Sequence, residues 1–463
     1  MDKLFIANLL YVAAAVLFIL GLKKLSHPKT ARNGNALASV GMLIAIVATL
    51  AFYGEIDYKL IILGMIIGSI IGALFAIKIE MTQMPQMVAL FNGFGGGASA
   101  LVAAAEFYSR TGAGETTTFL ISTIALSVFV GTLTLTGSLI AFAKLQGLIS
   151  GQPIVFKGQQ VFNAIMAIAM VAFAVGMVLV PVNIYMYFLG VVILAAVLGV
   201  TLTIPIGGAD MPVVISLLNS YSGVAAAATG FVLMNNGLII AGSLVGASGL
   251  ILTMIMCKGM NRSLANVIFG AVGLVQEDAS GGAQQQMNIK SYSTEEAAMI
   301  LDAAEKIIVV PGYGLAVAQA QHAVREVADF LEGQGKKVLY AIHPVAGRMP
   351  GHMNVLLAEA NIPYEQLKDL DEINPEFEDC DVAIVLGAND VVNPAARHDK
   401  SSPIYGMPIL DVDKSKTVLI NKRTMNPGFA GIQNELFGFD NSIMVFGDAK
   451  QMLQQLLKDL KDL

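Results

Sequence analysis

Runs of about 20 apolar residues recur along the first 258 residues of the chain, separated by short polar segments. A helix needs about 20 apolar residues to cross the hydrocarbon core of a bilayer. We expect a membrane-spanning helix for each run, and the first is too long and too well continued to be a cleaved signal peptide. The nine runs lie at about 4–22, 36–53, 60–78, 85–105, 118–142, 160–180, 183–204, 211–233 and 236–257.

Beyond residue 292 the pattern changes to short apolar runs that alternate with amphipathic stretches. The short runs predict buried strands, and the stretches between them predict helices. We therefore expect a polytopic α-helical membrane bundle of about nine spans, followed by a C-terminal α/β domain with a Rossmann-like doubly wound parallel sheet. The predicted strands are Ile307–Val310, Val338–Ile342, Val382–Leu386, Val418–Ile420 and Ile443–Val445, and the predicted helices are 315–333, 351–360, 431–437 and 448–460.

A linker is predicted between these two halves. Leu264–Val275 is apolar but too short to span a bilayer, and Glu277–Gln286 is polar and rich in glycine, as flexible tethers are. Ser293 followed by Glu296 predicts a capping box at the start of a helix. The resulting organisation is a membrane domain at 1–260, a linker at 261–292 and a second domain at 293–463.

Composition and charge separate the same two halves. The chain is 55% hydrophobic and only 13% charged, whereas ordinary soluble domains have about 25% charged residues. Residues 1–258 hold 11 Lys and Arg against 7 Asp and Glu, and the remaining residues hold 17 against 27. The acidic second half argues against nucleic acid as a partner, because nucleic-acid phosphates would repel it.

Basic residues predict the orientation of the spans, because cytoplasmic loops are enriched in Lys and Arg. The first connection holds Lys23, Lys24, Lys29 and Arg32, and we place it in the cytoplasm. An odd number of spans then puts the N-terminus outside and the C-terminal domain in the cytoplasm.

Three polar residues in or beside the apolar runs are candidates for function, because polar groups inside a bilayer are costly. Asn92 lies in the glycine-rich fourth run, Asn219 lies in the eighth, and Asp210 stands at the start of the eighth. Each asparagine can equally form a hydrogen bond between helices, and Asp210 can equally cap a helix. The glycines beside Asn92 allow either close helix packing or a narrow water-filled path.

Cysteines and histidines restrict the cofactor chemistry. The two cysteines, Cys257 and Cys380, fall in different halves, and the chain has no CxxC motif. We therefore expect neither a disulfide framework nor a metal site. None of the five histidines lies in an apolar run, which argues against a membrane haem held by paired histidines.

A glycine turn follows the first predicted strand of the second half. Gly312-Tyr313-Gly314 has the form that lets a dinucleotide pyrophosphate approach the backbone at a helix N-terminus. The second predicted strand ends at His343, without the acid that an NAD site places there to bind the ribose. Arg348 and the run Lys422-Arg423-Thr424 offer cations and a hydroxyl for a 2′-phosphate. This pattern favours NADP over NAD.

A nucleotide site joined to a membrane bundle indicates that chemistry outside the bilayer is coupled to movement across it. We expect hydride to come from another protein, because the chain has no further domain after the nucleotide fold to hold an organic substrate. Two alternatives stay open: a nucleotide-gated ion channel or transporter, and a membrane anchor for an NADP-binding subunit. The GYG triplet at 312–314 lies in the soluble half, which counts against a potassium filter.

Five long motifs resemble those of the β subunit of the bacterial proton-translocating NAD(P) transhydrogenase, and the resemblance covers essentially the whole chain. It implies a Re/Si-specific enzyme in the bacterial inner membrane, with a cytoplasmic NADP(H)-binding domain at 293–463. The motifs are PGYGLAVAQAQ at 311–321, HPVAGRMPGHMNVLLAEA at 343–360, GANDVVNPAA at 387–396, NKRTMNPGFAG at 421–431 and GADMPVVISLLNSYSG at 208–223.

The resemblance also implies the partner and the reaction. An α subunit, made of one or two polypeptides, would carry NAD(H) and further membrane helices, while this chain would hold NADP(H) in an orientation flipped relative to ordinary Rossmann enzymes. Hydride would pass directly from NADH to NADP⁺, driven by protons that flow inward. The implied assembly is a dimer of αβ units in membrane lipid.

By motif match, the resemblance implies roles for individual residues. Asp390 would be the acid that links nucleotide state to proton binding, and Asp210 and Asn219 would belong to the proton path. Asn92 stands where many relatives carry a proton-relay histidine, so a titrating group in the membrane falls to the partner's helices. Phe429 stands where relatives commonly have tyrosine. Together with the glycine turn, the residues expected to bind NADP(H) are Gly312, Tyr313, Gly314, Val345, Ala346, Gly347, Arg348, Met349, Pro350, Gly387, Ala388, Asn389, Asp390, Val391, Gly406, Met407, Lys422, Arg423, Thr424, Met425, Asn426, Pro427, Gly428, Phe429, Asp448 and Ala449.

Overall fold

The structure, a computed structural model, divides into two compact units. The first unit comprises Met1–Gly207 and Val214–Thr253, and the second comprises Gly208–Val213 and Met254–Leu463. The predicted linker segment Glu277–Gln286 lies outside the described residues, as do Pro350 and Phe429. The residues that the structure describes are 3–25, 28–52, 58–79, 83–208, 210–269, 289–349, 351–428 and 430–463.

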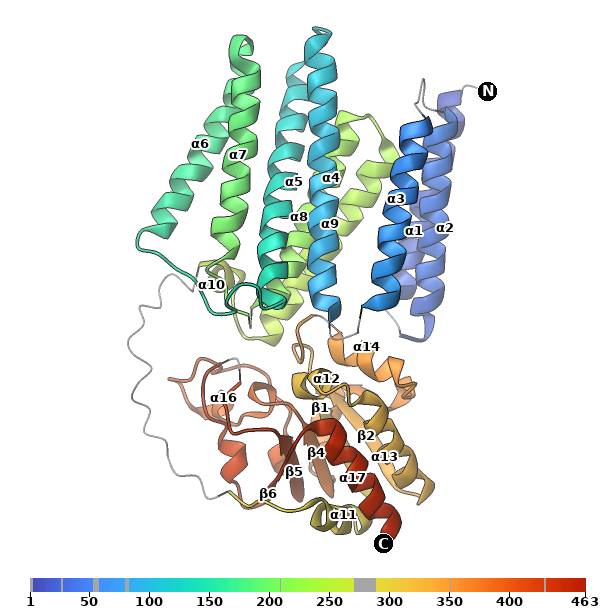
Figure 1. Ribbon diagram of the computed structural model, residues 1–463, viewed down its shortest axis with the longest axis vertical. Coiled ribbons are helices and arrows are strands. Elements are labelled where there is room, and N and C mark those ends of the chain that lie inside the picture. The colour runs from blue at the N-terminus through green and yellow to red at the C-terminus, as the bar shows by residue number, and fades with distance from the viewer. Residues whose placement is uncertain are drawn as a thin grey trace. The chain divides into compact units, whose positions relative to one another are not determined.

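Long helices form the first unit and run side by side (Figure 1). Within the described part of the chain, nine helices are long and apolar enough to cross a membrane, which confirms the predicted number of spans. They are α1 (Lys3–Leu25), α2 (Pro28–Phe52), α3 (Tyr58–Lys78), α4 (Met84–Gly112), α5 (Thr118–Leu145), α6 (Gln159–Leu179), α7 (Ile184–Thr203), α8 (Met211–Val232) and α9 (Asn236–Gly259).

Glycines allow two helix pairs of this unit to approach closely. A Cβ on Gly131 of α5 would lie 2.5 Å from the carbonyl oxygen of Gly96 on α4. A Cβ on Gly223 of α8 would lie 2.3 Å from the backbone nitrogen of Gly246 on α9. Small residues at a helix interface let the backbones come together where lipid provides no hydrophobic driving force. The glycine run after Asn92 therefore serves helix packing.

A six-stranded parallel sheet forms the centre of the second unit, in the order β3-β2-β1-β4-β5-β6. This is the strand order of a dinucleotide-binding Rossmann fold, so the predicted fold class is confirmed. All five predicted strands form, and the short β3 was missed. The strands are β1 (Lys306–Pro311), β2 (Lys337–Ile342), β3 (Leu367–Asp369), β4 (Val382–Leu386), β5 (Thr417–Lys422) and β6 (Ser442–Phe446).

Helices and short turns connect the strands. The predicted helix at 315–333 is interrupted near Gln319, whose φ is +48°, and the predicted helix at 431–437 is wrong, because only the 3₁₀ turn Glu435–Gly438 forms there. The capping box is confirmed: Ser293 and Glu296 bond each other's backbone N–H groups. The α-helices are α10 (Leu264–Phe269), α11 (Thr294–Asp302), α12 (Tyr313–Val317), α13 (Gln321–Gly333), α14 (His352–Glu359), α15 (Leu370–Ile373), α16 (Ala395–His398) and α17 (Ala449–Asp462), and the 3₁₀ turns are η2 (Pro181–Asn183), η4 (Tyr364–Gln366), η5 (Asn374–Phe377), η6 (Asp390–Val392), η7 (Val412–Lys414) and η8 (Glu435–Gly438).

Both faces of the sheet are covered, because alternate residues of each strand point to opposite sides. On one face Ile308 and Val310 of β1 pack against a core that includes Phe377 and Phe437 of the short turns. On the other face Val309 of β1 lies with residues of α13 and with Leu453 of α17. Burial on both faces explains why the central strands read as continuous apolar runs rather than alternating ones.

Candidate functional site

The candidate site lies where the strand order reverses. β1 and β4 are neighbours in the sheet, and the strands that follow each of them continue in opposite directions. Ligands of open α/β sheets bind outside the carboxyl ends of the strands at such a point. The two loops that begin there are the glycine turn Gly312–Gly314 and the segment Gly387–Asp390.

Contact between these two loops requires their glycines. The Gly312 N–H donates to the Leu386 carbonyl at 2.9 Å, and the Gly314 N–H donates to the Gly387 carbonyl at 3.0 Å. A Cβ on Gly314 would lie 2.7 Å from the Cα of Gly387. The glycines of this turn are therefore needed for its contact with the neighbouring loop.

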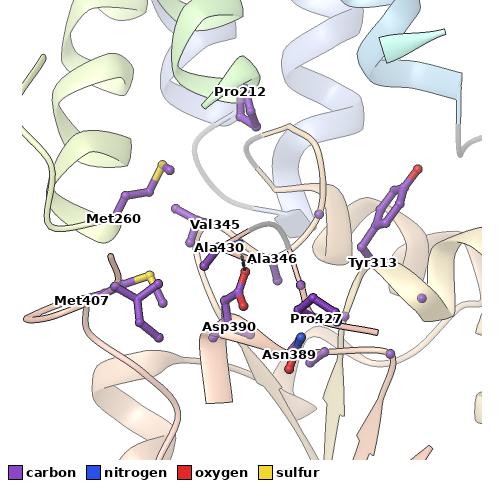
Figure 2. A pocket seen from close by; sticks show the side chains of 18 of the residues that line it. Pro212, Met260, Tyr313, Val345, Ala346, Asn389, Asp390, Met407, Pro427 and Ala430 are labelled. Atoms are coloured by element: carbon purple, nitrogen blue, oxygen red, sulfur yellow. Dashed lines mark hydrogen bonds between the residues drawn. The ribbon is translucent and has the colours of Figure 1, made fainter. Parts of the chain in front are cut away.

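A pocket of about 430 Å³ is bounded by these loops (Figure 2). Its volume falls within the range of small-molecule and cofactor sites. All of its residues belong to the second unit. The predicted binding residues that line it are Gly312, Tyr313, Gly314, Val345, Ala346, Gly347, Gly387, Ala388, Asn389, Asp390, Val391, Met407, Lys422, Asn426, Pro427 and Gly428, and the other lining residues are Asp210, Pro212, Met256, Met260, Arg262, Pro403, Ile404 and Ala430.

The carboxylate of Asp390 is held by the loop that follows β5. Its Oδ2 accepts the backbone N–H of Ala430 at 3.0 Å (Figure 2). A Cβ on Gly428 would lie 2.5 Å from Asp390 Oδ1, so a larger residue there would displace the carboxylate. The sequence motifs pointed to both segments, but not to this contact between them.

Lys422 places a cation in the same pocket. Its Nζ donates to the Asn426 carbonyl at 2.9 Å and lies 4.8 Å from the centre of the Phe437 ring. Burial lowers the pKa of Lys422 from its ordinary value, and the negative charge of Asp390 opposes that shift. A half-buried ammonium in the lining of the pocket suits an anionic ligand group.

Arg348 and Tyr313 form a second cationic element of the site. The guanidinium carbon of Arg348 lies 4.3 Å from the centre of the Tyr313 ring, which is within the range of a cation–π contact. Burial raises the pKa of Tyr313, and the nearby guanidinium partly offsets this. The contact joins the loop after β1 to the loop after β2.

Asn92 and Asn219, the two candidate residues of the membrane helices, lie in the first unit, where both are half-buried. Asn92 Nδ2 donates to Ser138 Oγ at 3.2 Å, which joins α4 to α5. Ser222 of α8 donates to the Asn92 carbonyl at 3.5 Å. The hydrogen bond between helices, one of the two interpretations left open by the sequence, is therefore formed by Asn92.

Asp210 forms an ion pair that the sequence did not predict. Its Oδ2 lies 2.8 Å from Arg262 Nη1, and its Oδ1 accepts from the same nitrogen at 3.1 Å. Arg262 lies shortly after α9, which ends at Gly259. Because the two residues are far apart in the chain, nothing in the local pattern of either one pointed to the other.

Comparison with known proteins settles the family. The family model described as NAD(P) transhydrogenase beta subunit matches residues 7–459. The chain belongs to the NAD(P) transhydrogenase β subunit family. Two curated proteins named NAD(P) transhydrogenase subunit beta, from Rhodospirillum rubrum and from a named strain of that species, are each 54% identical over 456 residues, which is 97% of this chain and 97% of each relative.

Family membership establishes the broad biochemistry of this transhydrogenase β subunit. The chain is a subunit of an enzyme that acts on NAD(P)(H), and as a β subunit it works with an α subunit. Its apolar helices make it a multi-pass membrane protein.

Several predicted residues of the transhydrogenase site do not line the pocket among the described residues. Arg348 lies over the ring of the lining residue Tyr313, and Asp448 caps α17 by accepting the N–H of Lys450 at 3.1 Å. Thr424 accepts the backbone N–H of Asn426 at 3.4 Å. The remaining residues of this group are Met349, Gly406, Arg423, Met425 and Ala449, and Pro350 and Phe429 are not described.

Two histidines that the sequence argument did not select hold the loop after β2. His343 Nε2 bonds the Pro408 carbonyl at 2.7 Å, and its Nδ1 accepts the Val345 N–H at 3.2 Å, so Nε2 carries the proton. His352 Nδ1 accepts the Arg348 N–H at 3.0 Å. Burial lowers the pKa of each histidine to about 4. Their positions within the motif at 343–360 were the only signal in the sequence.

Proposed function

We propose that this transhydrogenase β subunit binds NADP(H) in the pocket at the ends of β1 and β4 and exchanges hydride with NADH held by the α subunit. The observation that carries the proposal is the pocket at the reversal of the strand order, with Lys422 and Asp390 in its lining. The exchange is coupled to inward movement of protons through the membrane helices.

The choice of NADP over NAD rests on the charges around the pocket. A 2′-phosphate needs cations, and Lys422 provides one in the lining while Arg348 provides another on Tyr313. An NAD site needs an acid at the end of β2, where this chain has His343, buried and bonded to Pro408. The residues present therefore fit a phosphorylated dinucleotide.

The chain has little acid–base chemistry to perform on the hydride. NADP(H), when bound, supplies the group that accepts or donates the hydride. The loops Gly312–Gly314 and Gly387–Asp390 are held together by hydrogen bonds and glycine contacts, which gives a rigid surface against which to orient that group. Positioning of two reactants in this way is a large part of such catalysis.

Coupling requires that protonation alters the grip of the pocket on NADP(H). We assign this link to Asp390, because its carboxylate holds the loop at Ala430 and lies in the same pocket as Lys422. Asp210, Asn92 and Asn219 form the proposed proton path. One proton crossing 100 mV provides about 2.3 kcal/mol, and about 1.4 kcal/mol changes an equilibrium tenfold, so modest coupling shifts the NADPH to NADH ratio strongly.

The proposal places the protein in a bacterial inner membrane. The α/β domain faces the cytoplasm and the N-terminus faces outside, as the lysines and arginines of the first connection favour. Two αβ units form the working complex, and the α subunit supplies the titrating membrane group that Asn92 cannot provide.

Calorimetry tests nucleotide binding. The fragment 290–463 contains all six strands and is expected to bind NADPH more tightly than NADH. Lys422→Met should weaken NADPH binding by about tenfold, the cost of losing one charge-assisted contact. Lys416→Met is the matched control, because Lys416 lies before the opposite end of β5 and pairs with Asp381. Equal affinity of the two variants would refute the site.

Vesicles that contain the complex with the α subunit test the coupling. Hydride exchange between NADH and NADP⁺ is measured with an imposed proton gradient and again with an uncoupler. The proposal expects the gradient to change the rate or the direction of exchange. Ion flux without hydride exchange would instead favour the channel or transporter alternative.

A further inference from the structure

Lys144 is a buried cation at the end of a membrane helix. It is the second-last residue of α5 and only 4% exposed. Its Nζ donates to three backbone carbonyls: Gln152 at 3.1 Å, Ile204 at 2.5 Å and Ile206 at 2.8 Å. An ammonium has three N–H donors, so these contacts use all of them. Among the described residues, no carboxylate forms an ion pair with Lys144.

Two of the three carbonyls that bind Lys144, those of Ile204 and Ile206, belong to the end of α7 and the turn after it. Ile204 is the C-cap of α7, and the Ile206 N–H bonds the Thr203 carbonyl at 3.1 Å. The last carbonyls of a helix lack partners within the helix and carry a partial negative charge. A cation placed there both satisfies these groups and compensates the helix dipole.

The connection between α5 and α6 is attached to the same helix end. The Ile154 N–H also donates to the Ile204 carbonyl, at 3.3 Å. Gln159, fully buried, donates from Nε2 to the Thr201 carbonyl at 2.9 Å. Side chains and backbone from two directions therefore converge on the turn that leads from α7 into α8, with Lys144 as the charged member.

We propose that Lys144 is a positioning residue for proton coupling: its ammonium holds the turn between α7 and α8 and so fixes the segment that leads into α8. That helix carries Asn219, and Asp210 immediately precedes it. The inference rests on the proposed coupling function. A lysine that served only to mark the cytoplasmic side would extend its charge to water, whereas Lys144 directs its charge inward to carbonyls.

The test uses the intact complex of this chain with its α subunit in vesicles. Lys144→Met removes the charge at similar length, Lys144→Gln keeps two N–H donors without charge, and Lys144→Arg keeps the charge. Lys157→Met is the matched control, because Lys157 is exposed on the same connection. The coupling ratio is the rate of hydride exchange with an imposed proton gradient divided by the rate with an uncoupler.

We expect Lys144→Met to lower the coupling ratio by at least about fivefold, while the uncoupled rate stays within about twofold of the wild type. Lys144→Arg should recover most of the ratio, and Lys157→Met should leave it unchanged. A coupling ratio of Lys144→Met equal to that of Lys157→Met overturns the proposal.

If Lys144→Met fails to assemble, Lys144→Gln is measured in the same way, and a coupling ratio of Lys144→Gln equal to that of the wild type overturns the proposal. Failure of both neutral variants to assemble assigns Lys144 a purely structural role and also overturns it. A coupling ratio of one for the wild-type complex refutes the proposed coupling itself. If the coupling ratio of the wild-type complex is above one and the Lys144 variants have the same ratio, only the role of Lys144 is refuted.

Discussion

Replacement of Gly387 by alanine tests the contact on which the candidate site depends. The φ of Gly387 is +67°, and a Cβ there would lie 2.3 Å from the Cα of Gly314. The neighbouring atom is backbone in the opposite loop, so no flexible side chain can move aside. The substitution must therefore separate the loop after β1 from the loop after β4.

The expected cost combines two effects. The left-handed backbone conformation costs a residue with a Cβ about 1–2 kcal/mol, and forcing an extra carbon into a packed contact costs about 1–3 kcal/mol. The sum of about 2–5 kcal/mol is a large share of the about 5–15 kcal/mol that separates folded from unfolded domains. A domain of this size loses about 2–4 °C of melting temperature per kcal/mol.

Three matched variants separate these effects. Gly314→Ala introduces the contact, 2.7 Å from the Cα of Gly387, without a positive φ. Gly335→Ala places a Cβ in open space on a residue whose φ is +85°, and Gly333→Ala places a Cβ in open space on a residue without a positive φ. We expect Gly387→Ala to lower the melting temperature most, Gly335→Ala to lower it by a few degrees, and Gly333→Ala to leave it near the wild-type value.

The assay is thermal unfolding of the fragment 290–463, followed by circular dichroism, with NADPH affinity measured on each folded variant. Both Gly387→Ala and Gly314→Ala should weaken NADPH binding, because the two loops line one pocket. A Gly387→Ala fragment that melts within about 2 °C of Gly335→Ala and binds NADPH normally would refute the argument from the loop contact.

Three further variants test other features. The pKa of Asp381 is lowered to about 2 by hydrogen bonds from Lys416 and from the backbone N–H groups of 305 and 306. The stability that Asp381 contributes to the folded domain is therefore present above about pH 4 and lost as the pH falls toward 2. In urea unfolding, Asp381→Asn should lower the free energy of unfolding by about 1 kcal/mol at pH 7 but by little at pH 2. Asp448→Ala should cost about 1 kcal/mol in the same assay, because it removes the N-cap of α17; an unchanged midpoint would contradict this. Gly131→Ala should lower the melting temperature of the purified chain, because a Cβ there would lie 2.5 Å from the Gly96 carbonyl oxygen, whereas Gly112→Ala, with open space around it, should not.

Features that depend on short stretches of sequence were predictable. The length of an apolar run is enough to identify a membrane span, and all nine candidate spans are helices within the described residues. The central strands were equally clear, because a strand buried on both faces is apolar throughout. The capping box at Ser293 involves residues three positions apart, so its geometry is local.

Features that depend on neighbours in space were missed or wrong. β3 has the sequence Leu-Lys-Asp and becomes a strand only by pairing with β2. The segment 431–437 has helix-forming residues, but Asn434 bonds the Asn389 carbonyl and the Leu436 N–H instead. Gln319 takes a left-handed conformation that divides the predicted helix. In the first two cases a tertiary contact overrides a weak local preference.

The sequence by itself determined that membrane helices precede a parallel α/β domain, because the length and spacing of apolar residues are local properties that any stable fold must bury. Only the tertiary structure decided that Gly314 meets Gly387, that Asp390 holds Ala430, and that Asp210 pairs with Arg262. These partners lie far apart in the chain. Strand order and helix packing bring them together, and no pattern along a single segment encodes either.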